Sequence, residues 1–524
     1  MTSGAGAQPG ELSPADGSGP PELLAYPSAR GRWVVAAMIM GSSVAGIDST
    51  VVAVALPAIG RDLHVGFQAL QWTVTSYTLT LASLILLAGS LSDRWGRRRV
   101  FLVGLGWFTV ASVLCAAAPG IGWLIAARAV QGIGGALMTP ASLAIIEAAF
   151  RPGDRTHAIG TWAGFSGVSA AVAPFIGGWL LEAGSWRWIF LINVPVAAVA
   201  AWVTRRHVPE SRDTSASGSA DWPGALAGVV ALATITYAII VLPGAGVRSP
   251  QFAAAAVLAV VSSAAFVVIE RRGKHPMLPP AIFAPAQFRA ANAVTFVVNG
   301  ALGGFAFVFI PALEIIAGYS PVVAGSALVP VTVMTLLLSG TSGRLAQRIG
   351  PRPLVVAGCL VCAGASMLAV RVGPHASYWT AVFPLAVLFG LGLASLIPPL
   401  TASAMSSAPD SLAGLASGVN NAVARVAGLL WIAALPPITG LTGAAYADPA
   451  QFRSSFAQIS WICAAAFACA AAIAATFITG LRPTPAPGTA LIQTPVPHLA
   501  CPVAFGHAPG QSRRPDGGAG QAVR

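Results

Sequence analysis

The stretch Gly89-Ser-Leu-Ser-Asp-Arg-Trp-Gly-Arg-Arg-Arg99 lies between two long apolar runs. It holds one carboxylate and four arginines in a chain of which only 9% of the residues are charged. A weaker copy, Gly343-Arg-Leu-Ala-Gln-Arg-Ile-Gly-Pro-Arg352, lies in the same position between two later apolar runs. A charged hairpin that recurs between apolar runs indicates a membrane protein with an internal repeat.

The composition excludes a soluble globular protein. The 524 residues are 56% hydrophobic and have a mean hydropathy of +0.75, and the charged fraction is far below the roughly 25% of a soluble domain. Fourteen apolar runs are long enough to cross a bilayer, which takes about 20 residues. We therefore expect an all-α membrane protein. The runs cover approximately residues 33–55, 70–89, 100–118, 122–147, 157–181, 187–204, 222–243, 251–269, 290–313, 322–340, 353–371, 378–400, 413–436 and 456–480.

The net charge of +12 comes from arginines in alternate loops and does not form one basic patch. This alternation is the positive-inside pattern, which places both termini in the cytoplasm and the protein in the cytoplasmic membrane. It also argues against a nucleic-acid partner, which requires a contiguous basic surface. The arginine-rich loops lie at residues 94–99, 151–155, 205–212, 271–289 and 344–352.

An internal repeat relates the two parts of the chain. An offset of 254 residues, from 89 to 343, places Gly343 on Gly89 and Gly350 on Gly96 without a gap. The repeat predicts two six-helix bundles with the seventh and eighth runs as an inserted pair. The expected segments are a disordered tail at 1–30, a bundle at 31–206, a linker with the inserted helices at 207–275, a bundle at 276–481 and a second disordered tail at 482–524.

An acidic residue, Asp48, lies inside the first apolar run. Placing an acid there costs at least about 2.5–3.5 kcal/mol, and such residues often form proton or ion pathways. Asp48 is thus a candidate site for proton coupling. The alternative is a structural aspartate bonded to Ser49, Thr50 or a backbone amide.

A basic residue, Arg128, lies inside the fourth run. Arg128, Gln131 and Gly135 recur at helical spacing and share one face. A buried arginine needs a partner, and Asp48 is a candidate for that partner. Hydrogen bonds to backbone carbonyls are the alternative.

The charged hairpin has two possible roles. Gly89 and Gly96 would allow close approach of backbones, and Gly96 can adopt a positive φ at the turn. Asp93 can accept hydrogen bonds from a helix N-terminus or pair with an arginine. Topology alone accounts for Arg94, Arg97 and Arg98, but it does not account for the aspartate and the glycines. A conformational latch is the hypothesis that accounts for all of them.

The fifth run carries a stripe of small residues with one proline. Small faces let membrane helices pack closely, and proline can kink a helix. The stripe is either a static packing surface or a contact that opens and closes. Its members are Gly160, Gly164, Gly167, Ala171, Pro174 and Gly178.

Other intramembrane polar or aromatic residues are less decisive. Glu314 is either a second acid in the pathway or a side chain that reaches the surface. Trp72 and Tyr77 either line a cavity or pack, and Arg425 shares a face with Asn421. No nucleophile–base or metal-ligand set is visible, and no GxxxxGK[ST] loop occurs. We therefore expect no enzyme activity, no metal and no cofactor.

Together these residues resemble the major facilitator superfamily over residues 33–480, and within it the fourteen-helix drug:proton antiporters. The hairpin resembles the superfamily's loop motif, and Arg128 lies where its fourth-helix motif carries an arginine implicated in proton coupling. Asp48 lies at the acid of the first-helix motif. The antiporter motif of the fifth helix corresponds to Gly164, Gly167, Pro174, Gly177 and Gly178. Departures occur at Ala53, Ala173 and Glu314, where the family usually has Asn, Gly and Gln.

The resemblance implies a proton-coupled exporter of small, largely hydrophobic compounds such as drugs or antibiotics, working by alternating access. Its partners would be the substrate, protons and the lipid bilayer, and we expect a monomer. An ion-coupled importer of a small metabolite and a non-transporting membrane sensor are the alternatives.

Overall fold

The computed structural model describes residues 23–212, 220–246, 248–273, 276–407, 412–443 and 448–479. Most of both predicted tails lies outside these residues. The described chain consists of helices and turns, with no β-strand element among its described segments. The helices are α1 (Ala29–Leu63), α2 (Phe67–Trp95), α3 (Arg97–Ala116), α4 (Ile121–Ala149), α5 (Pro152–Glu182), α6 (Trp188–Leu191), α7 (Asn193–His207), α8 (Trp222–Ala245), α9 (Pro250–Arg272), η1 (Pro280–Phe283), α10 (Ala286–Ile315), α11 (Pro321–Ser326), α12 (Val329–Ile349), α13 (Pro351–Leu368), η2 (Ala369–Arg371), η3 (Tyr378–Val382), α14 (Phe383–Ser406), α15 (Ala413–Ile438) and α16 (Pro449–Phe477).

Within the described residues, 14 helical segments are long and apolar enough to cross a membrane. Each coincides with one of the predicted apolar runs, so the predicted all-α membrane fold is confirmed. The helices extend beyond several predicted ends, and α12 continues to Ile349, past the predicted end at residue 340. Helical hydrogen bonds do not require apolar side chains, so hydropathy marks only the part of each helix that faces lipid.

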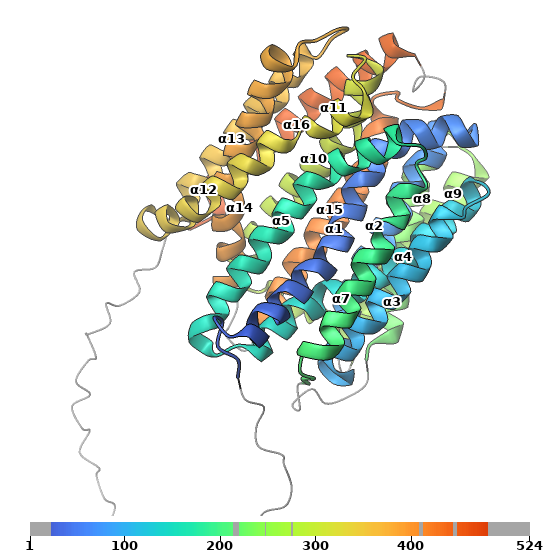
Figure 1. The fold of residues 1–524 in the computed structure, drawn as a ribbon. Helices are drawn as coiled ribbons and strands as arrows, with labels where there is room; N and C mark the ends of the chain where they lie inside the picture. Colours follow the sequence, from blue (N-terminus) through green and yellow to red (C-terminus); the bar gives the residue numbers. More distant parts are fainter. Residues whose placement is uncertain are drawn as a thin grey trace, which may run out of the picture. The chain divides into compact units, whose positions relative to one another are not determined.

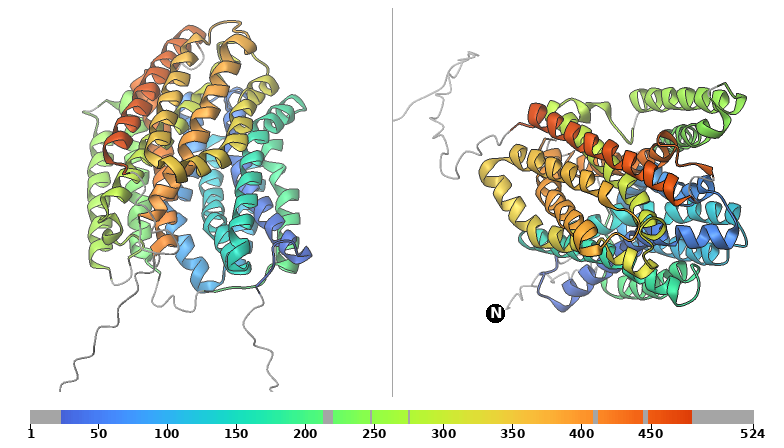
Figure 2. Two further views of the ribbon diagram at one scale, coloured as in Figure 1. Left: turned by 90° about the vertical axis from the view of Figure 1, so that its left-hand side faces the viewer. Right: turned by 90° about the horizontal axis from the view of Figure 1, so that it is seen from above.

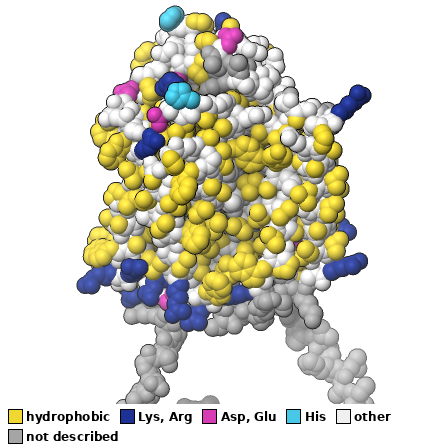
Figure 3. Space-filling model, turned by 90° about the vertical axis from the view of Figure 1, so that its right-hand side faces the viewer, with side chains coloured by type: hydrophobic (Ala, Val, Ile, Leu, Met, Phe, Trp, Pro, Cys, Tyr) yellow, Lys and Arg dark blue, Asp and Glu magenta, His cyan; other side chains and the backbone are white. Residues whose placement is uncertain are grey.

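The surface carries a broad apolar belt, and Lys and Arg side chains gather along its lower edge (Figure 3). Leu226 on α8 and Val260 on α9 contribute to the exposed apolar surface with 66% and 70% exposure. In water such a surface would be unfavourable, whereas in a bilayer it contacts acyl chains. The helices run between the two ends of this belt (Figure 1).

The membrane helices form two groups and a separate pair. Helices α1 to α7 pack mainly against one another, and so do α10 and α12 to α16. Seen from above, the two groups occupy opposite sides, and the α8–α9 pair lies at the edge (Figure 2). Of this pair, α8 contacts both α2 and α15.

In each group, the repeated hairpin has a glycine with a positive φ at its turn. Gly96 joins α2 to α3 with a φ of 108°, and Gly350 joins α12 to α13 with a φ of 88°. A side chain at either position would be strained, because L-residues rarely adopt positive φ. The sequence repeat therefore corresponds to a repeated backbone turn.

Near its C-terminal end, α5 of the first group touches α11 of the second group backbone to backbone. A Cβ atom placed on Gly178 would lie 2.5 Å from the carbonyl oxygen of Pro321. A Cβ atom on Gly325 would collide with the carbonyl oxygen of Pro174. Only glycine permits this contact, so this end of the α5 stripe is sealed.

A second link between the groups joins α2 to α15. The side-chain amide of Gln71 donates hydrogen bonds to the carbonyls of Ile432 and Ala433, at 2.7 and 3.0 Å. In a regular helix these carbonyls would accept from residues 436 and 437, which are both prolines without an N–H group. Gln71 therefore satisfies two carbonyls that the prolines leave without a partner.

The other end of the α5 stripe has no such contact. A Cβ atom on Gly160 or Gly167 would meet nothing within 4 Å, and one on Gly164 would only approach Leu336, at 4.0 Å. The stripe is thus sealed at one end and free at the other. Along α5 the two groups therefore separate toward the end of the molecule where α5 begins, while Leu86 of α2 still packs against Ala416 and Val419 of α15.

We predict that Gly178→Ala weakens the sealed contact, because the added methyl group overlaps the backbone of α11. Gly167→Ala is the matched control on the same helix and should have no effect. Spin labels at the exposed positions Ala183 and Val323, in a chain without native cysteines, would report the α5–α11 separation. We expect longer label distances in Gly178→Ala than in the control, and identical distances would contradict the prediction.

Candidate functional site

A buried ion pair lies in the centre of the first group of helices. Asp48 on α1 and Arg128 on α4 are each only 1% exposed, and Nη1 of Arg128 donates to Oδ2 of Asp48. Nε of Arg128 donates to the carbonyl of Thr73 on α2, at 3.2 Å. Ser49 and Thr50 donate to backbone carbonyls and do not hold the carboxylate.

Two amides complete the contacts of this carboxylate. Nε2 of Gln131 and Nδ2 of Asn193 both donate to Oδ1 of Asp48, at 2.8 and 3.2 Å. The same amide nitrogens donate to Oγ of Ser112 on α3, at 2.9 and 3.3 Å. Oε1 of Gln131 in turn accepts from Arg128 at 2.6 Å. The network thus connects α1, α3, α4 and α7.

Aromatic rings cover the guanidinium. The ring of Tyr77 lies 4.4 Å from Cζ of Arg128, and the ring of Phe190 lies 5.7 Å from it. The close packing of α4 on α2 makes the Tyr77 contact possible, because Gly132 lies directly against the carbonyl of Tyr77. The hydroxyl of Tyr77 is buried and has no hydrogen-bond partner in the described structure. Tyr77 therefore belongs to the buried network.

Sequence reasoning identified Asp48, Arg128 and Gln131 but missed Asn193 and Ser112. Asn193 is a polar residue at the start of α7, within the apolar stretch that follows Trp186. Its isolation in an apolar stretch was a usable signal, because buried amides require partners. Ser112 gave no comparable signal, since a serine in a membrane helix can bond to its own backbone.

The charged hairpin forms a second polar cluster. Oδ1 of Asp93 accepts from Nε and Nη2 of Arg97, at 3.1 and 2.9 Å. Nη1 of Arg97 donates to the carbonyl of Ala144 at 3.2 Å. These bonds connect the end of α2, the start of α3 and α4.

An acid that sequence reasoning missed, Glu210, caps the start of α3. Its Oε1 accepts from the backbone N–H of Arg98 at 3.0 Å, and Arg98 donates to the carbonyl of Val208 at 3.1 Å. The segment after α7 also accepts from the N–H of Arg97 through the carbonyl of Ser211, at 2.9 Å. A negative charge at a helix N-terminus is stabilising. A lone acid directly after a basic helix end was the available signal.

Residues 38–432 match the sequence profile of the Major Facilitator Superfamily. The chain belongs to this superfamily. It is 36% identical over 427 residues to the puromycin resistance protein pur8 of Streptomyces alboniger, covering 80% of this chain and 84% of that protein. It is 34% identical to the multidrug resistance protein Stp of Mycobacterium tuberculosis, covering 77% of this chain and 75% of that protein. For the tetracenomycin C resistance and export protein of Streptomyces glaucescens the identity is 35%, with coverages of 78% and 76%.

Solved structures show the same fold. A peptide transporter POT in complex with sulfate aligns with a TM-score of 0.61 at 15% identity, covering 84% of this chain and 94% of that chain. The human organic anion transporter MFSD10 aligns with a TM-score of 0.56 at 16% identity, covering 85% and 100%. The major facilitator fold predicted from sequence is thus confirmed.

One feature of the superfamily's loop motif differs from expectation. A Cβ atom on Gly89 would approach only Pro140, at 3.7 Å, which is an ordinary contact. The expected close backbone approach at Gly89 is therefore wrong for this conformation. Nη1 of Arg94 is buried but has no hydrogen-bond partner among the described residues. In the second hairpin Gln347 is exposed.

The remaining candidate residues lie outside the buried network. Trp72 packs against Tyr237 of α8, with ring centroids 6.3 Å apart. Oε1 of Glu314 is buried without a hydrogen-bond partner in the described structure, and the charge of Arg61 acts on this carboxyl. On α15, Asn421 is half-buried and Arg425 is exposed. Arg425 is close enough to act electrostatically on Tyr77.

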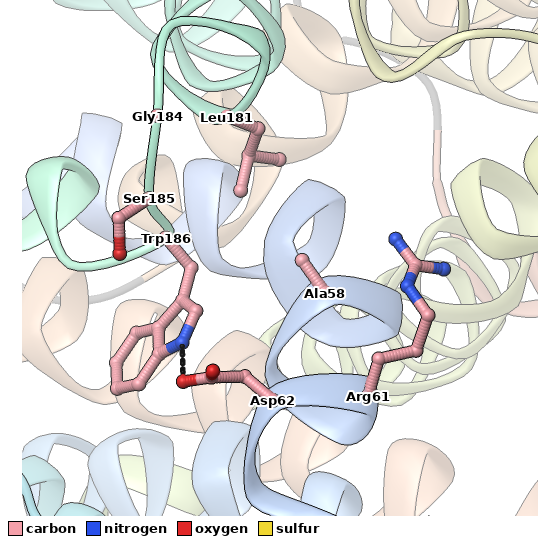
Figure 4. A pocket seen from close by; sticks show the side chains of 7 residues that line it. All are labelled: Ala58, Arg61, Asp62, Leu181, Gly184, Ser185 and Trp186. Atoms are coloured by element: carbon pink, nitrogen blue, oxygen red, sulfur yellow. Dashed lines mark hydrogen bonds between the residues drawn. The ribbon is translucent and has the colours of Figure 1, made fainter.

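A pocket of about 350 Å³ lies at the sealed end of the helices, next to the end of α1 (Figure 4). There Oδ2 of Asp62 accepts from Nε1 of Trp186 at 2.8 Å and from Arg187 at 2.9 Å. Asp62 is thus paired. In the described ranges no group of three or more His, Cys, Asp or Glu residues could hold a metal ion. The lining residues are Ala58, Arg61, Asp62, Leu181, Gly184, Ser185 and Trp186.

We predict that Asp48→Asn lowers the free energy of unfolding by about 3–5 kcal/mol, because it leaves a buried guanidinium without a counter-charge. Asp48→Asn/Arg128→Gln should cost less than the sum of the two single variants. Unfolding of the purified protein in mild detergent measures both effects.

The exposed pair Asp62–Arg187 is the matched control for this cycle. Its coupling should stay below about 1 kcal/mol, because solvent screens it. Additive effects of the substitutions at Asp48 and Arg128 would contradict the view that the two residues form one electrostatic unit.

Proposed function

We propose that the protein is a proton-coupled antiporter that exports small, largely hydrophobic compounds across the bacterial cytoplasmic membrane. The observation that carries the proposal is the buried Asp48–Arg128 ion pair, set in a chain whose relatives are named for antibiotic resistance and export. A charged pair is expensive to bury and is retained in membrane proteins mainly at pathways and relays. All elements of the route lie in one chain, so a monomer suffices.

The network supports coupling because it responds to a single proton. Protonation of Asp48 would remove the negative charge and leave the cation of Arg128 without a counter-charge in a buried site. This state is costly, so the helices that share the carboxylate must rearrange or admit water. Because the hydrogen-bond network around this carboxylate joins α1, α3, α4 and α7, one proton acts on most of the first group. The membrane potential contributes about 2.3 kcal/mol per charge per 100 mV to such a step.

The two ends of α5 support alternating access. The end near Gly178 is sealed by α11 and is reinforced by Gln71, whereas the end near Gly160 is free. With the arginine-rich end in the cytoplasm, as the positive-inside pattern requires, the sealed end faces outward. The described conformation would then be the one in which an exporter receives its substrate from the cytoplasm.

The hairpin cluster supports a latch at the cytoplasmic rim. Asp93 and Arg97 connect three helices, and Glu210 connects the hairpin to the segment after α7. These bonds must keep or exchange their partners when the first group rotates. The second hairpin has Gln347 in place of the aspartate, so the charged latch is confined to the first.

We predict that Asp48→Asn abolishes proton-driven export while the protein still inserts into the membrane. A resistance screen against a panel of apolar antibiotics, including puromycin, would select a probe compound. Everted vesicles that contain the parent chain should accumulate that probe when their interior is acidic. In vesicles that contain Asp48→Asn, the initial rate of accumulation should be at least about tenfold lower. Asp448→Asn, which alters an exposed helix cap, is the matched control.

Full accumulation by Asp48→Asn would contradict proton coupling at this residue. If no compound accumulates in everted vesicles and intact cells take one up instead, the protein is an importer. A ligand that binds but never crosses in proteoliposomes would indicate a sensor.

We further predict that Asp93→Asn slows transport far more than Gln347→Ala, at equal amounts of protein in the membrane. Asp93→Asn removes the negative charge that pairs with Arg97 and leaves only a neutral amide oxygen as acceptor, whereas Gln347 is exposed. Initial rates in the same vesicles measure the difference. Equal rates for the two variants would count against the latch.

A further inference from the structure

Two carboxylates meet where the inserted helices α8 and α9 come closest to the charged hairpin. Asp221 is the N-cap of α8, and Glu270 lies in the last turn of α9 and is only 4% exposed. Because α8 and α9 are antiparallel neighbours, the start of one lies beside the end of the other. Ala225, in the first turn of α8, packs against Leu91 near the end of α2.

Each carboxylate uses one oxygen to hold the backbone. Oδ1 of Asp221 accepts from the N–H of Gly224 at 2.8 Å, and Oε2 of Glu270 accepts from the N–H of Leu278 at 2.9 Å. The other two oxygens, Oδ2 of Asp221 and Oε1 of Glu270, are buried and have no hydrogen-bond partner in the described structure. Neither acid takes part in an ion pair within the described ranges.

The two unpartnered oxygens point into the same space. A Cβ atom placed on Gly224 would lie 2.5 Å from Oδ2 of Asp221 and 2.9 Å from Oε1 of Glu270. The oxygens are therefore separated by no more than the sum of these lengths. Glycine keeps the space between them free of a side chain. Two ionised carboxylates so close together repel each other, so the pair requires either a bound cation or a shared proton.

We propose that Oδ2 of Asp221 and Oε1 of Glu270 bind one divalent cation of the hard, oxygen-preferring class, Mg²⁺ or Ca²⁺. Such ions take oxygen ligands at about 2.0–2.6 Å and accept one or two carboxylates with water in the remaining positions. Two carboxylates also supply the charge that a divalent ion neutralises. The neighbouring Arg271 and Arg272 are exposed.

The bound cation would fasten the inserted helices to the rest of the molecule. Glu270 fixes Leu278, which leads into the start of α10, and Met277 packs with Leu87 and Leu91 of α2. The ion would thus hold the ends of α8 and α9, the following linker and α2 in one arrangement. It lies apart from Asp48 and Arg128, so its role is separate from proton coupling.

The test uses the purified full chain in mild detergent after removal of metal ions with a chelator. Addition of Mg²⁺ or Ca²⁺ at millimolar concentration should raise the Tm by several degrees in a saturable manner, relative to NaCl at equal ionic strength. Mn²⁺ as a spectroscopic substitute should show one bound ion per chain by electron paramagnetic resonance. Glu270→Gln and Asp221→Asn should lose both responses, and Asn retains the helix cap.

Two further variants make the test specific. Gly224→Ala should weaken ion binding because its methyl group occupies the space between the two oxygens. Asp448→Asn removes the charge of an exposed helix cap on α16 and should keep both responses. If Glu270→Gln does not fold, Mn²⁺ binding to Asp221→Asn and Gly224→Ala decides the question.

Four results would overturn the proposal. The first is a Tm that does not depend on divalent cations in the parent chain. The second is the same dependence in Glu270→Gln as in the parent. The third is a stabilisation by acid alone that Glu270→Gln abolishes, because the two carboxylates would then share a proton. A loss of stability in Lys274→Gln without any cation dependence would likewise assign the counter-charge to that lysine.

Discussion

A carboxylate and a guanidinium buried side by side in a membrane protein must both stay satisfied, and the first group of helices is arranged around this constraint. Removing either charge leaves the other in a medium that cannot solvate it. Asp48 and Arg128 therefore require donors and acceptors at fixed positions, which Gln131, Asn193 and Thr73 supply. A change in the charge of the Asp48 carboxylate would therefore alter the hydrogen bonds that hold these helices together.

The second group shares the backbone arrangement but not this chemistry. Its hairpin has a positive φ at Gly350, as the hairpin of the first group has at Gly96. In the second group, α10 and α15 are joined by neutral hydrogen bonds from the side-chain amide of Asn420 to Asn292 and Thr295, at 3.2 and 3.0 Å. A duplicated architecture therefore carries an asymmetric distribution of charge, in which the first group contains the buried Asp48–Arg128 ion pair and the hairpin with Asp93.

The contacts between the groups are of a different kind. At the sealed end they include the glycine contacts of α5 with α11, the hydrogen bonds from the Gln71 amide to two carbonyls, and a bond from the N–H of Val322 to Oε1 of Glu182 at 3.4 Å. A neutral hydrogen bond contributes only about 0.5–1.5 kcal/mol. When the glycine surfaces of α5 and α11 move apart, these glycines leave no charged group without a partner. The buried Asp48–Arg128 ion pair lies within the first group, so separation of the two groups does not break it. Such a division lets the groups separate at low cost while the network inside stays intact.

The sequence by itself determined the fourteen spans, the positive-φ turn at Gly96 and the two intramembrane charges, because hydropathy, turn conformation and residue type are local properties. Only the tertiary structure showed that Asn193 and Ser112 complete the Asp48 site, that Gln71 bonds α15 and that Asp221 faces Glu270. Each of these depends on which faces of distant helices meet. Polar residues in a membrane must find partners, but the identity of the partner is decided by helix packing, which the order of residues along one helix does not contain.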